Sequence, residues 1–154
     1  FYGSVAVVEV AAEWCGPCRA SAAATEQEYQ DLKDRGFVMI NVLIDGLSQD
    51  AEPDPGRWTE DMELTFPVIG DHDQSISSNY INQGQSFSIP NFTVFDRTLT
   101  IRARQTHAID WDLVNSLLDE DPPEVDYPMP SNAAELRSQL GITEDSWIHP
   151  FSAD

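Results

Sequence analysis

Two cysteines separated by two residues, directly after a strand-like apolar run, are the feature that most constrains this chain. The segment Trp14-Cys15-Gly16-Pro17-Cys18 holds both cysteines of the 154-residue sequence. No cysteine is left elsewhere to form a long-range disulfide or to complete a four-ligand zinc site. A disulfide across so short a loop stabilises a fold little, because it removes little entropy from the unfolded chain. We therefore interpret the pair as chemically active.

The residues around the cysteines predict a strand, a helix and a second strand. Residues 5–11 are apolar and rich in valine, which indicates a strand covered on both faces. Residues 19–35 are rich in Ala, Glu and Gln and stop at Gly36, which predicts a helix with the cysteines at its N-terminal end. Residues 37–44 predict a second buried strand, parallel to the first through a right-handed crossover.

Weaker patterns predict the remaining elements and the extent of the domain. In chain order they are an exposed loop at 45–56, a helix at 57–64, a strand at 66–70, a helix at 73–81, strands at 91–95 and 99–105 joined by a turn at 96–98, and an amphipathic helix at 110–118. Residues 119–130 are dense in acid and proline, which is typical of a connector. We predict an α/β domain over residues 1–119 and an appendage over 120–154 with a short helix at 133–140.

Acidic side chains outnumber basic ones by 27 to 8, which gives a net charge of −19. Such a surface repels nucleic-acid phosphates and anionic lipid headgroups. No stretch approaches the roughly 20 consecutive apolar residues that a membrane-spanning helix needs. We expect no nucleic-acid binding and no membrane contact by these residues, and we expect a monomer.

A position at the start of a helix would activate the first cysteine. A thiol becomes a nucleophile when it loses its proton, and the amides and dipole of a helix N-terminus favour the anion. Cys15, the more exposed sulfur, would attack a substrate disulfide, and Cys18 would resolve the mixed disulfide. Gly16 and Pro17 keep the turn compact. Pro17 is tolerated there because a residue in the first turn of a helix has no partner for a backbone N–H. Arg19 would either steady the thiolate or lie solvated on the helix.

The segment Ala12-Glu13-Trp14-Cys15-Gly16-Pro17-Cys18-Arg19 resembles the active-site segment of thioredoxins. Over residues 5–118 the chain resembles the TlpA-type branch of the thioredoxin-like superfamily. That resemblance includes the insertion before Phe66-Pro67-Val68 and the pattern Ile89-Pro90-Asn91-Phe92-Thr93-Val94-Phe95-Asp96. It implies a thioredoxin fold, with a central mixed sheet flanked by helices, a loop-helix insertion and a C-terminal extension.

The same resemblance implies roles for residues near the cysteines. Ile89-Pro90 would be a cis peptide bond beside Cys15 that helps to hold an extended substrate; without the resemblance, Pro90 would be taken as an ordinary strand starter. Trp14 would flank the sulfurs and offer a flat surface to substrate, and a packing role suits it equally. Substrate contacts are also expected from Gly16, Pro17 and Ile89.

Glu9 lies six residues before Cys15, where relatives of this branch carry a buried acid. A buried carboxyl has a raised pKa, which would fit it to move a proton to or from Cys18 near neutral pH. The alternative is an edge or solvent-facing glutamate. We list Glu9 with Cys15, Cys18 and Pro90 as the predicted catalytic residues.

The predicted activity is thiol-disulfide exchange with a protein disulfide or dithiol, with an upstream thiol as electron donor. Gly-Pro between the cysteines resembles the reducing thioredoxins, so reduction is favoured over oxidation. We expect no metal and no cofactor beyond the redox-active disulfide. The resemblance implies an extracytoplasmic location, either periplasmic, secreted or anchored through a segment upstream of Phe1, with the cytoplasm as the alternative.

Two other classes of function compete with this prediction. A peroxidase would share the fold, but the Pro-x-x-x-Thr-x-x-Cys arrangement of peroxiredoxins is missing from the sequence. A non-catalytic binding or metal-delivery module would use the acidic tail or Asp71-His72-Asp73. Copper chaperones of related fold use Cys-x-x-x-Cys with a distant histidine, and the cysteine pair here has one intervening residue fewer, although two thiolates remain suitable ligands for Cu(I).

Overall fold

The computed structural model describes residues 1–80 and 88–124. By its internal contacts the chain separates into a unit of residues 1–123 and a unit of residues 124–154. The helix predicted at 133–140 lies outside the described residues, as does the rest of the appendage from residue 125 onward. The elements below belong to the first unit.

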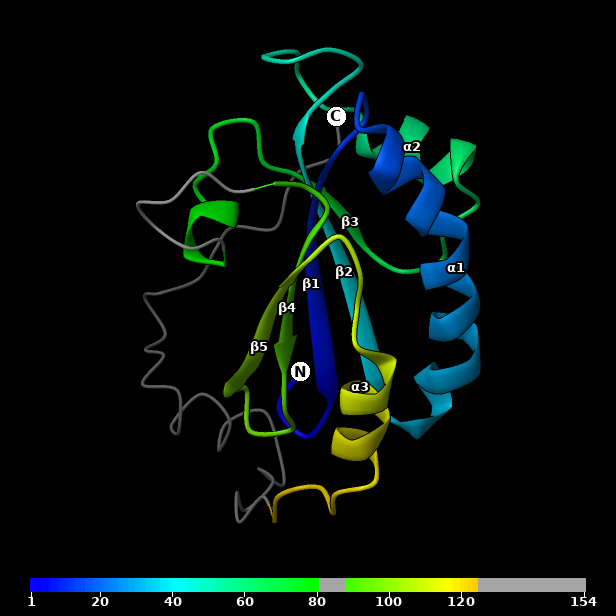
Figure 1. Ribbon diagram of the computed structural model, residues 1–154, viewed down its shortest axis with the longest axis vertical. Coiled ribbons are helices and arrows are strands. Elements are labelled where there is room, and N and C mark those ends of the chain that lie inside the picture. Colours follow the sequence, from blue (N-terminus) through cyan, green and yellow to red (C-terminus); the bar gives the residue numbers. More distant parts are fainter. Residues whose placement is uncertain (81–87, 125–154) are drawn as a thin grey trace, which may run out of the picture. The chain divides into compact units, whose positions relative to one another are not determined.

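The centre of this unit is a five-stranded mixed sheet with the strand order β3-β2-β1-β4-β5 (Figure 1). Its strands are β1 (Val5–Ala12), β2 (Phe37–Asp45), β3 (Val68–Gly70), β4 (Asn91–Phe95) and β5 (Ile101–Thr106). β2 runs parallel to both β1 and β3, whereas β4 runs antiparallel to both β1 and β5. The predicted fold class, a mixed sheet flanked by helices, is confirmed.

The central strand β1 is buried along its whole length, as its apolar sequence predicts. Its neighbours β2 and β4 satisfy its backbone on both edges. Glu9 lies in the middle of this strand and is buried with it. The alternative of an edge or solvent-facing glutamate is therefore wrong, because the position has neither a free edge nor access to solvent.

Helix α1 (Gly16–Leu32) begins three residues earlier than predicted. The reason is its cap: Cys15 has extended backbone angles, and its Sγ accepts a hydrogen bond from the Cys18 amide at 3.1 Å. A 3₁₀ turn (Lys33–Arg35) continues the helix to Gly36, which ends it with a φ of 87°. The cysteine turn and the first turn of α1 are thus one structural unit.

Helix α2 (Pro55–Asp61) lies partly in the stretch predicted to be a loop. It starts two residues early because Asp54 caps it, with Oδ1 accepting a hydrogen bond from the Arg57 amide at 3.0 Å. Pro55 fits the first turn, where no N–H donor is needed. The insertion therefore places a short helix near the start of α1, where it meets the active-site segment.

Helix α3 (Trp111–Leu118) starts one residue later than predicted, because Asp110 is its cap. It lies beside the C-terminal end of α1 (Figure 1). There Arg35 donates hydrogen bonds to the side chains of Asn115 at 2.6 Å and Asp119 at 2.8 Å. This end of the molecule is remote from the cysteines.

The helix predicted at 73–81 is wrong for the residues that the structure describes, which form only a 3₁₀ turn (Ser77–Asn79). The chain wraps around the carboxylate of Asp71, which accepts hydrogen bonds from the amides of Ile76 at 2.9 Å and Ser77 at 2.7 Å. Gln74 has a φ of 56°, which no α-helix contains. The Asp71 carboxylate thus accepts hydrogen bonds from amides that would donate to backbone carbonyls in a helix.

The connection between β4 and β5 is longer than the predicted three-residue turn. Asp96 accepts hydrogen bonds from the amides of Thr98 at 2.9 Å and Thr100 at 3.0 Å, and Leu99 has a φ of 63°. β5 consequently begins at Ile101 and not at Leu99. The strand-like composition of the turn was misleading, because a side-chain carboxylate holds its backbone.

Apolar side chains of the sheet and helices form one core. Its largest fully buried members are aromatic and aliphatic: Trp58, Phe92, Met39 and Leu43. Within residues 1–80 and 88–124, no helix has the length and apolarity to cross a membrane.

Candidate active site

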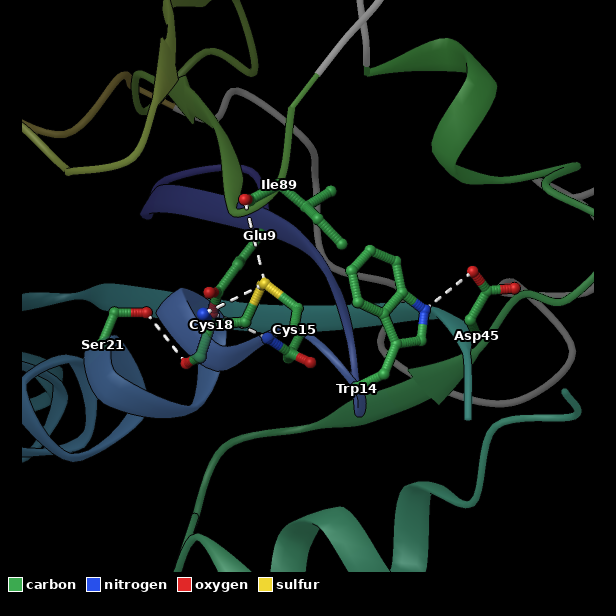
Figure 2. The surroundings of a disulfide bond; sticks show 8 residues. Glu9, Trp14, Cys15, Cys18, Ser21, Asp45 and Ile89 are labelled. Atoms are coloured by element: carbon green, nitrogen blue, oxygen red, sulfur yellow. Dashed lines mark hydrogen bonds between the residues drawn. A yellow bond between two sulfur atoms is a disulfide. The ribbon is translucent and has the colours of Figure 1, made fainter. Parts of the chain in front are cut away.

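Cys15 and Cys18 form a disulfide between the end of β1 and the first turn of α1 (Figure 2). Their Cα atoms lie 5.2 Å apart. The Cys18 amide points at Cys15 Sγ, so the same N–H would favour negative charge on that sulfur after reduction. The two predicted cysteines are therefore brought together in the predicted place.

The two sulfur-bearing residues are both nearly inaccessible in the disulfide form. Cys15 is 2% exposed and Cys18 is 0% exposed. Cys15 is the more exposed of the two, as predicted, although the difference in exposure is small. The Ile89 carbonyl oxygen lies 3.8 Å from Cys15 Sγ, and the Trp14 indole stands nearby (Figure 2). These neighbours leave only a small part of Cys15 to solvent.

The Ile89-Pro90 peptide bond is cis and lies next to the disulfide. The Pro90 carbonyl accepts a hydrogen bond from the His107 amide at 3.0 Å. The start of β4 is thereby tied to the connection between β5 and α3. Pro90 itself is buried, whereas Ile89 is half-buried and extends its side chain toward Trp14 (Figure 2).

An exposed rim surrounds the disulfide. Trp14, Gly16 and Pro17 are all exposed, and Trp14 shows 39% of its surface to solvent. The Trp14 indole Nε1 donates a hydrogen bond to Asp45 Oδ2 at 3.1 Å, which holds the ring at the end of β2. Trp14 is therefore a fixed surface residue and is not part of the core.

Glu9 is 2% exposed and lies close to Cys18 (Figure 2). Burial raises the pKa of its carboxyl to about 7, against which hydrogen bonds with Asn41 and Ser21 act to lower it. Asn41 Nδ2 donates to Glu9 Oε2 at 2.7 Å, and the Ser21 hydroxyl donates to the Cys18 carbonyl at 3.0 Å. The carboxyl can thus take up or release a proton near neutral pH.

Asn41 and Ser21 were missed by the sequence analysis. Asn41 interrupts the apolar run of β2 and lies opposite Glu9 in the parallel register of β1 and β2. A polar residue inside a buried strand was the available signal. Ser21 lies one turn after Cys18 on α1, and its sequence position alone carried no comparable signal.

Glu13 is a second buried acid that the sequence analysis did not single out. Its Oε1 accepts a hydrogen bond from the Asp54 amide at 2.6 Å. Its Oε2 accepts from Arg57, from Nε at 2.9 Å and also from Nη2. The residue directly before Trp14 is therefore ion-paired to α2.

Arg19 does not point its charge at the sulfurs. Its guanidinium lies over the Trp58 ring, 5.4 Å from the ring centroid, and 3.7 Å from the Asp61 carboxylate. Both partners belong to α2. Arg19 is thus a partly exposed helix residue that joins α1 to the inserted helix.

Asp71, the buried acid next to His72, has a structural role, because its carboxylate accepts backbone hydrogen bonds. Within the described ranges, no three His, Cys, Asp or Glu side chains come together as metal ligands would.

Comparison with known proteins identifies the family. The model of the AhpC/TSA family matches residues 1–104, which is more than half of the chain. The chain belongs to the AhpC/TSA family. This family and, in fold, the solved structure described below agree with the thioredoxin-like resemblance of the sequence.

Two curated relatives match parts of this family member. The thiol-disulfide oxidoreductase ResA of Oceanobacillus iheyensis is 28% identical over 69 residues, covering 45% of this chain and 34% of that protein. The 14 kDa light chain of the flagellar outer-arm dynein of Chlamydomonas reinhardtii is 41% identical over 46 residues, covering 30% of this chain and 36% of that protein. The matches span about a third of the length of each relative.

A solved structure agrees in fold. The crystal structure of a putative thiol:disulfide interchange protein DsbE from Chlorobium tepidum matches with a TM-score of 0.62 at 23% identity, over 76% of this chain and 82% of that chain. The thioredoxin fold is thus confirmed. The family and the Cys15–Cys18 disulfide together support a redox role for this AhpC/TSA protein.

Proposed function

We propose that the protein is a thiol-disulfide oxidoreductase that reduces protein disulfides through a mixed disulfide at Cys15. One observation carries the proposal: a Cys15–Cys18 disulfide caps α1, with a backbone amide directed at Cys15 Sγ. The arrangement gives the first sulfur electrostatic stabilisation as an anion and places the second within bonding distance of it.

In the first step, the Cys15 thiolate attacks one sulfur of a substrate disulfide. The Cys15–substrate bond forms as the substrate disulfide breaks, and the departing substrate sulfur takes a proton from solvent. The exposed rim of Trp14, Gly16 and Pro17 and the half-buried Ile89 offer the surrounding surface. An extended substrate segment lying along Ile89 would bring its sulfur to Cys15.

In the second step, Cys18 resolves the mixed disulfide. Its thiol must first lose a proton, and we propose Glu9 as the acceptor; the burial of its carboxyl and its position near Cys18 support this role. Because burial raises the pKa of Glu9 to about 7, the carboxyl can accept this proton and later release it near neutral pH. The Cys18 thiolate then forms the Cys15–Cys18 disulfide and frees the reduced substrate.

We propose reduction as the physiological direction, because Gly16-Pro17 resembles the spacer of reducing thioredoxins. An upstream dithiol would return the pair to the reduced form. With a net charge of −19, the protein would favour cationic or neutral substrates. We also propose an extracytoplasmic location and a monomeric state, the location on the strength of the TlpA-type resemblance.

The Cys18→Ser variant tests the mechanism. After reduction it should still attack a disulfide through Cys15 but should be unable to release its target. Incubation with insulin whose disulfides are intact should produce covalent complexes, and excess dithiothreitol should separate them by reducing the mixed disulfide. The Cys15→Ser, Cys18→Ser double variant is the matched control and should capture nothing. The mechanism is wrong if Cys15 in the reduced single variant resists iodoacetamide and captures no substrate.

A redox titration of the wild-type protein tests the direction. A reductant should have a potential nearer the value of about −270 mV typical of thioredoxin than the value of about −120 mV typical of a strong oxidant. A measured potential near the second value would show that the protein oxidises its partners.

A further inference from the structure

The ion pair between Glu13 and Arg57 lies directly before the reactive segment. The Glu13 side chain is 1% exposed, yet three donors from the start of α2 satisfy its carboxylate. Arg57 remains 38% exposed in its side chain and also lies 3.4 Å from Asp54 Oδ2. A buried carboxylate is stable as an anion only when such partners replace its water.

The backbone around Glu13 is held as firmly as its side chain. The Glu13 amide donates to the Asp45 carbonyl at 3.1 Å, and the Trp14 amide donates to the Gly46 carbonyl at 3.0 Å. The Cys15 amide in turn donates to the Ala12 carbonyl at 3.0 Å. The Glu13 charge therefore has a fixed position two residues before the sulfur that must become negative.

A fixed negative charge at that position opposes formation of a thiolate. At a separation of roughly 10 Å near a protein surface, a like charge should raise the pH midpoint of thiol ionisation by about one unit. Arg57 cancels this repulsion, because its positive charge directly contacts the Glu13 carboxylate. The inserted helix α2 thus supplies the charge that the cysteine turn lacks.

We propose that Arg57 is a positioning residue: it neutralises the charge of Glu13 and thereby allows the Cys15 thiol to ionise near neutral pH. This inference rests on the proposed function, since it requires Cys15 to be the attacking group. Arg57 touches Glu13 and Asp54 and acts on the sulfur only through them.

Other charged groups face the same segment from the surrounding elements. They are Asp45 at the end of β2, Asp54 before α2, the pair of Arg19 and Asp61 between α1 and α2, and Glu9 in β1. None of them is altered in the variants below. Their contributions therefore cancel in each comparison.

The test measures the alkylation rate of Cys15 by iodoacetamide against pH in a reduced Cys18→Ser background. Arg57→Gln should raise the pH midpoint of alkylation by about one unit, because Glu13 loses its counter-charge. Arg57→Lys keeps the charge and should shift the midpoint by less than half as much. The neutral pair Glu13→Gln, Arg57→Gln should return the midpoint to that of the background.

Arg35→Gln is the matched control. Arg35 also forms an ion pair, with Asp119 at 2.8 Å, and its side chain is 40% exposed. It lies beyond the C-terminal end of α1, roughly 30 Å along the helix from Cys15. The same loss of one positive charge should leave the alkylation midpoint unchanged.

The outcomes separate this inference from the proposed function. An unchanged midpoint in Arg57→Gln would overturn the inference while leaving a reactive background intact. A double variant shifted as far as Arg57→Gln would also overturn it, because a purely structural role does not depend on charge. An inert Cys15 in the background would instead overturn the proposed function. Circular dichroism verifies folding. If Arg57→Gln fails to fold, Glu13→Gln alone decides the question: it leaves the Arg57 charge without its partner and should lower the alkylation midpoint, and an unchanged midpoint would overturn the inference.

Discussion

Glu9 and Glu13 lie four residues apart around the end of β1, and each is 2% exposed. Glu9 has the neutral amide of Asn41 as its side-chain donor from β2, whereas Glu13 has the guanidinium of Arg57 and a backbone amide. The two carboxyls are therefore equally buried but differ in their chemical environment. Glu9 can exchange a proton near pH 7, and Glu13 holds a compensated charge. The partner, more than the burial, decides which role a carboxyl takes.

The positions of the two acids explain their different partners. Glu9 lies inside the sheet, where the register of β1 places it opposite Asn41 on one side and Phe92 on the other. Glu13 follows the last residue of β1 and can reach beyond the sheet to α2. Glu9 is thus enclosed by the sheet and α1, whereas Glu13 pairs with the partly exposed Arg57 of α2.

The largest expected effect is the pH dependence of stability from Glu9. Its pKa is about 7 in the folded protein against 4.5 as the ordinary value, so between these pH values the folded state binds more protons than the unfolded state. Stability should therefore fall as pH rises through this window. Glu9→Gln should be more stable than wild type by about 3 kcal/mol at pH 8 and equal to it near pH 4. Urea unfolding of the oxidised proteins at several pH values measures this, and equal slopes for both proteins would contradict it.

The second effect is on the rate at which Cys18 resolves the mixed disulfide. Without a carboxylate to accept its proton, Cys18 in Glu9→Gln should react about 100-fold more slowly at pH 7. Reaction of the reduced protein with Ellman's reagent releases one thionitrobenzoate when Cys15 attacks and a second when Cys18 resolves. The second absorbance phase should slow while the first is retained. Equal slowing of both phases would remove Glu9 from the resolving step.

The third effect is the stability lost when the Glu13 charge loses its partner. Arg57→Ala should lower the free energy of unfolding by more than the loss of a fully exposed ion pair does, because it leaves the buried Glu13 carboxylate without its counter-charge. Arg35→Ala, which breaks the exposed pair with Asp119, should lower it by less than about 1 kcal/mol. Urea unfolding at pH 7 compares the two variants. Equal losses would mean that the burial of Glu13 adds nothing to its ion pair.

The smallest effect concerns the donor of Glu9. Asn41→Val removes the hydrogen bond that partly offsets burial, so the pKa of Glu9 should rise further. The pH window of falling stability should extend above pH 7, with an additional loss of about 1 kcal/mol at pH 9 relative to pH 4. The same pH series of unfolding curves tests this. An unchanged window would show that Asn41 does not influence Glu9.

The order of the main elements could be predicted from the sequence because their signals are local. A continuous apolar run predicts a buried strand, and Gly36 predicts the end of the first helix; both are confirmed. Where a side chain replaced a backbone partner, the prediction failed. Asp71 accepts a hydrogen bond from the Ile76 amide, and a turn forms where a helix was predicted. Asp96 accepts one from the Thr100 amide, and a turn forms where a strand was predicted to start.

The cysteine pair was determined by the sequence itself, since a separation of three residues at the start of a helix brings Cys15 and Cys18 together. Glu9 could be located only through its resemblance to relatives and its place in an apolar strand. Its donor Asn41, the ion pair of Glu13 with Arg57 and the near-complete burial of Cys15 were decided by the tertiary structure. These features join residues 32 to 74 positions apart, and such contacts exist only after the sheet has formed and α2 has packed against it.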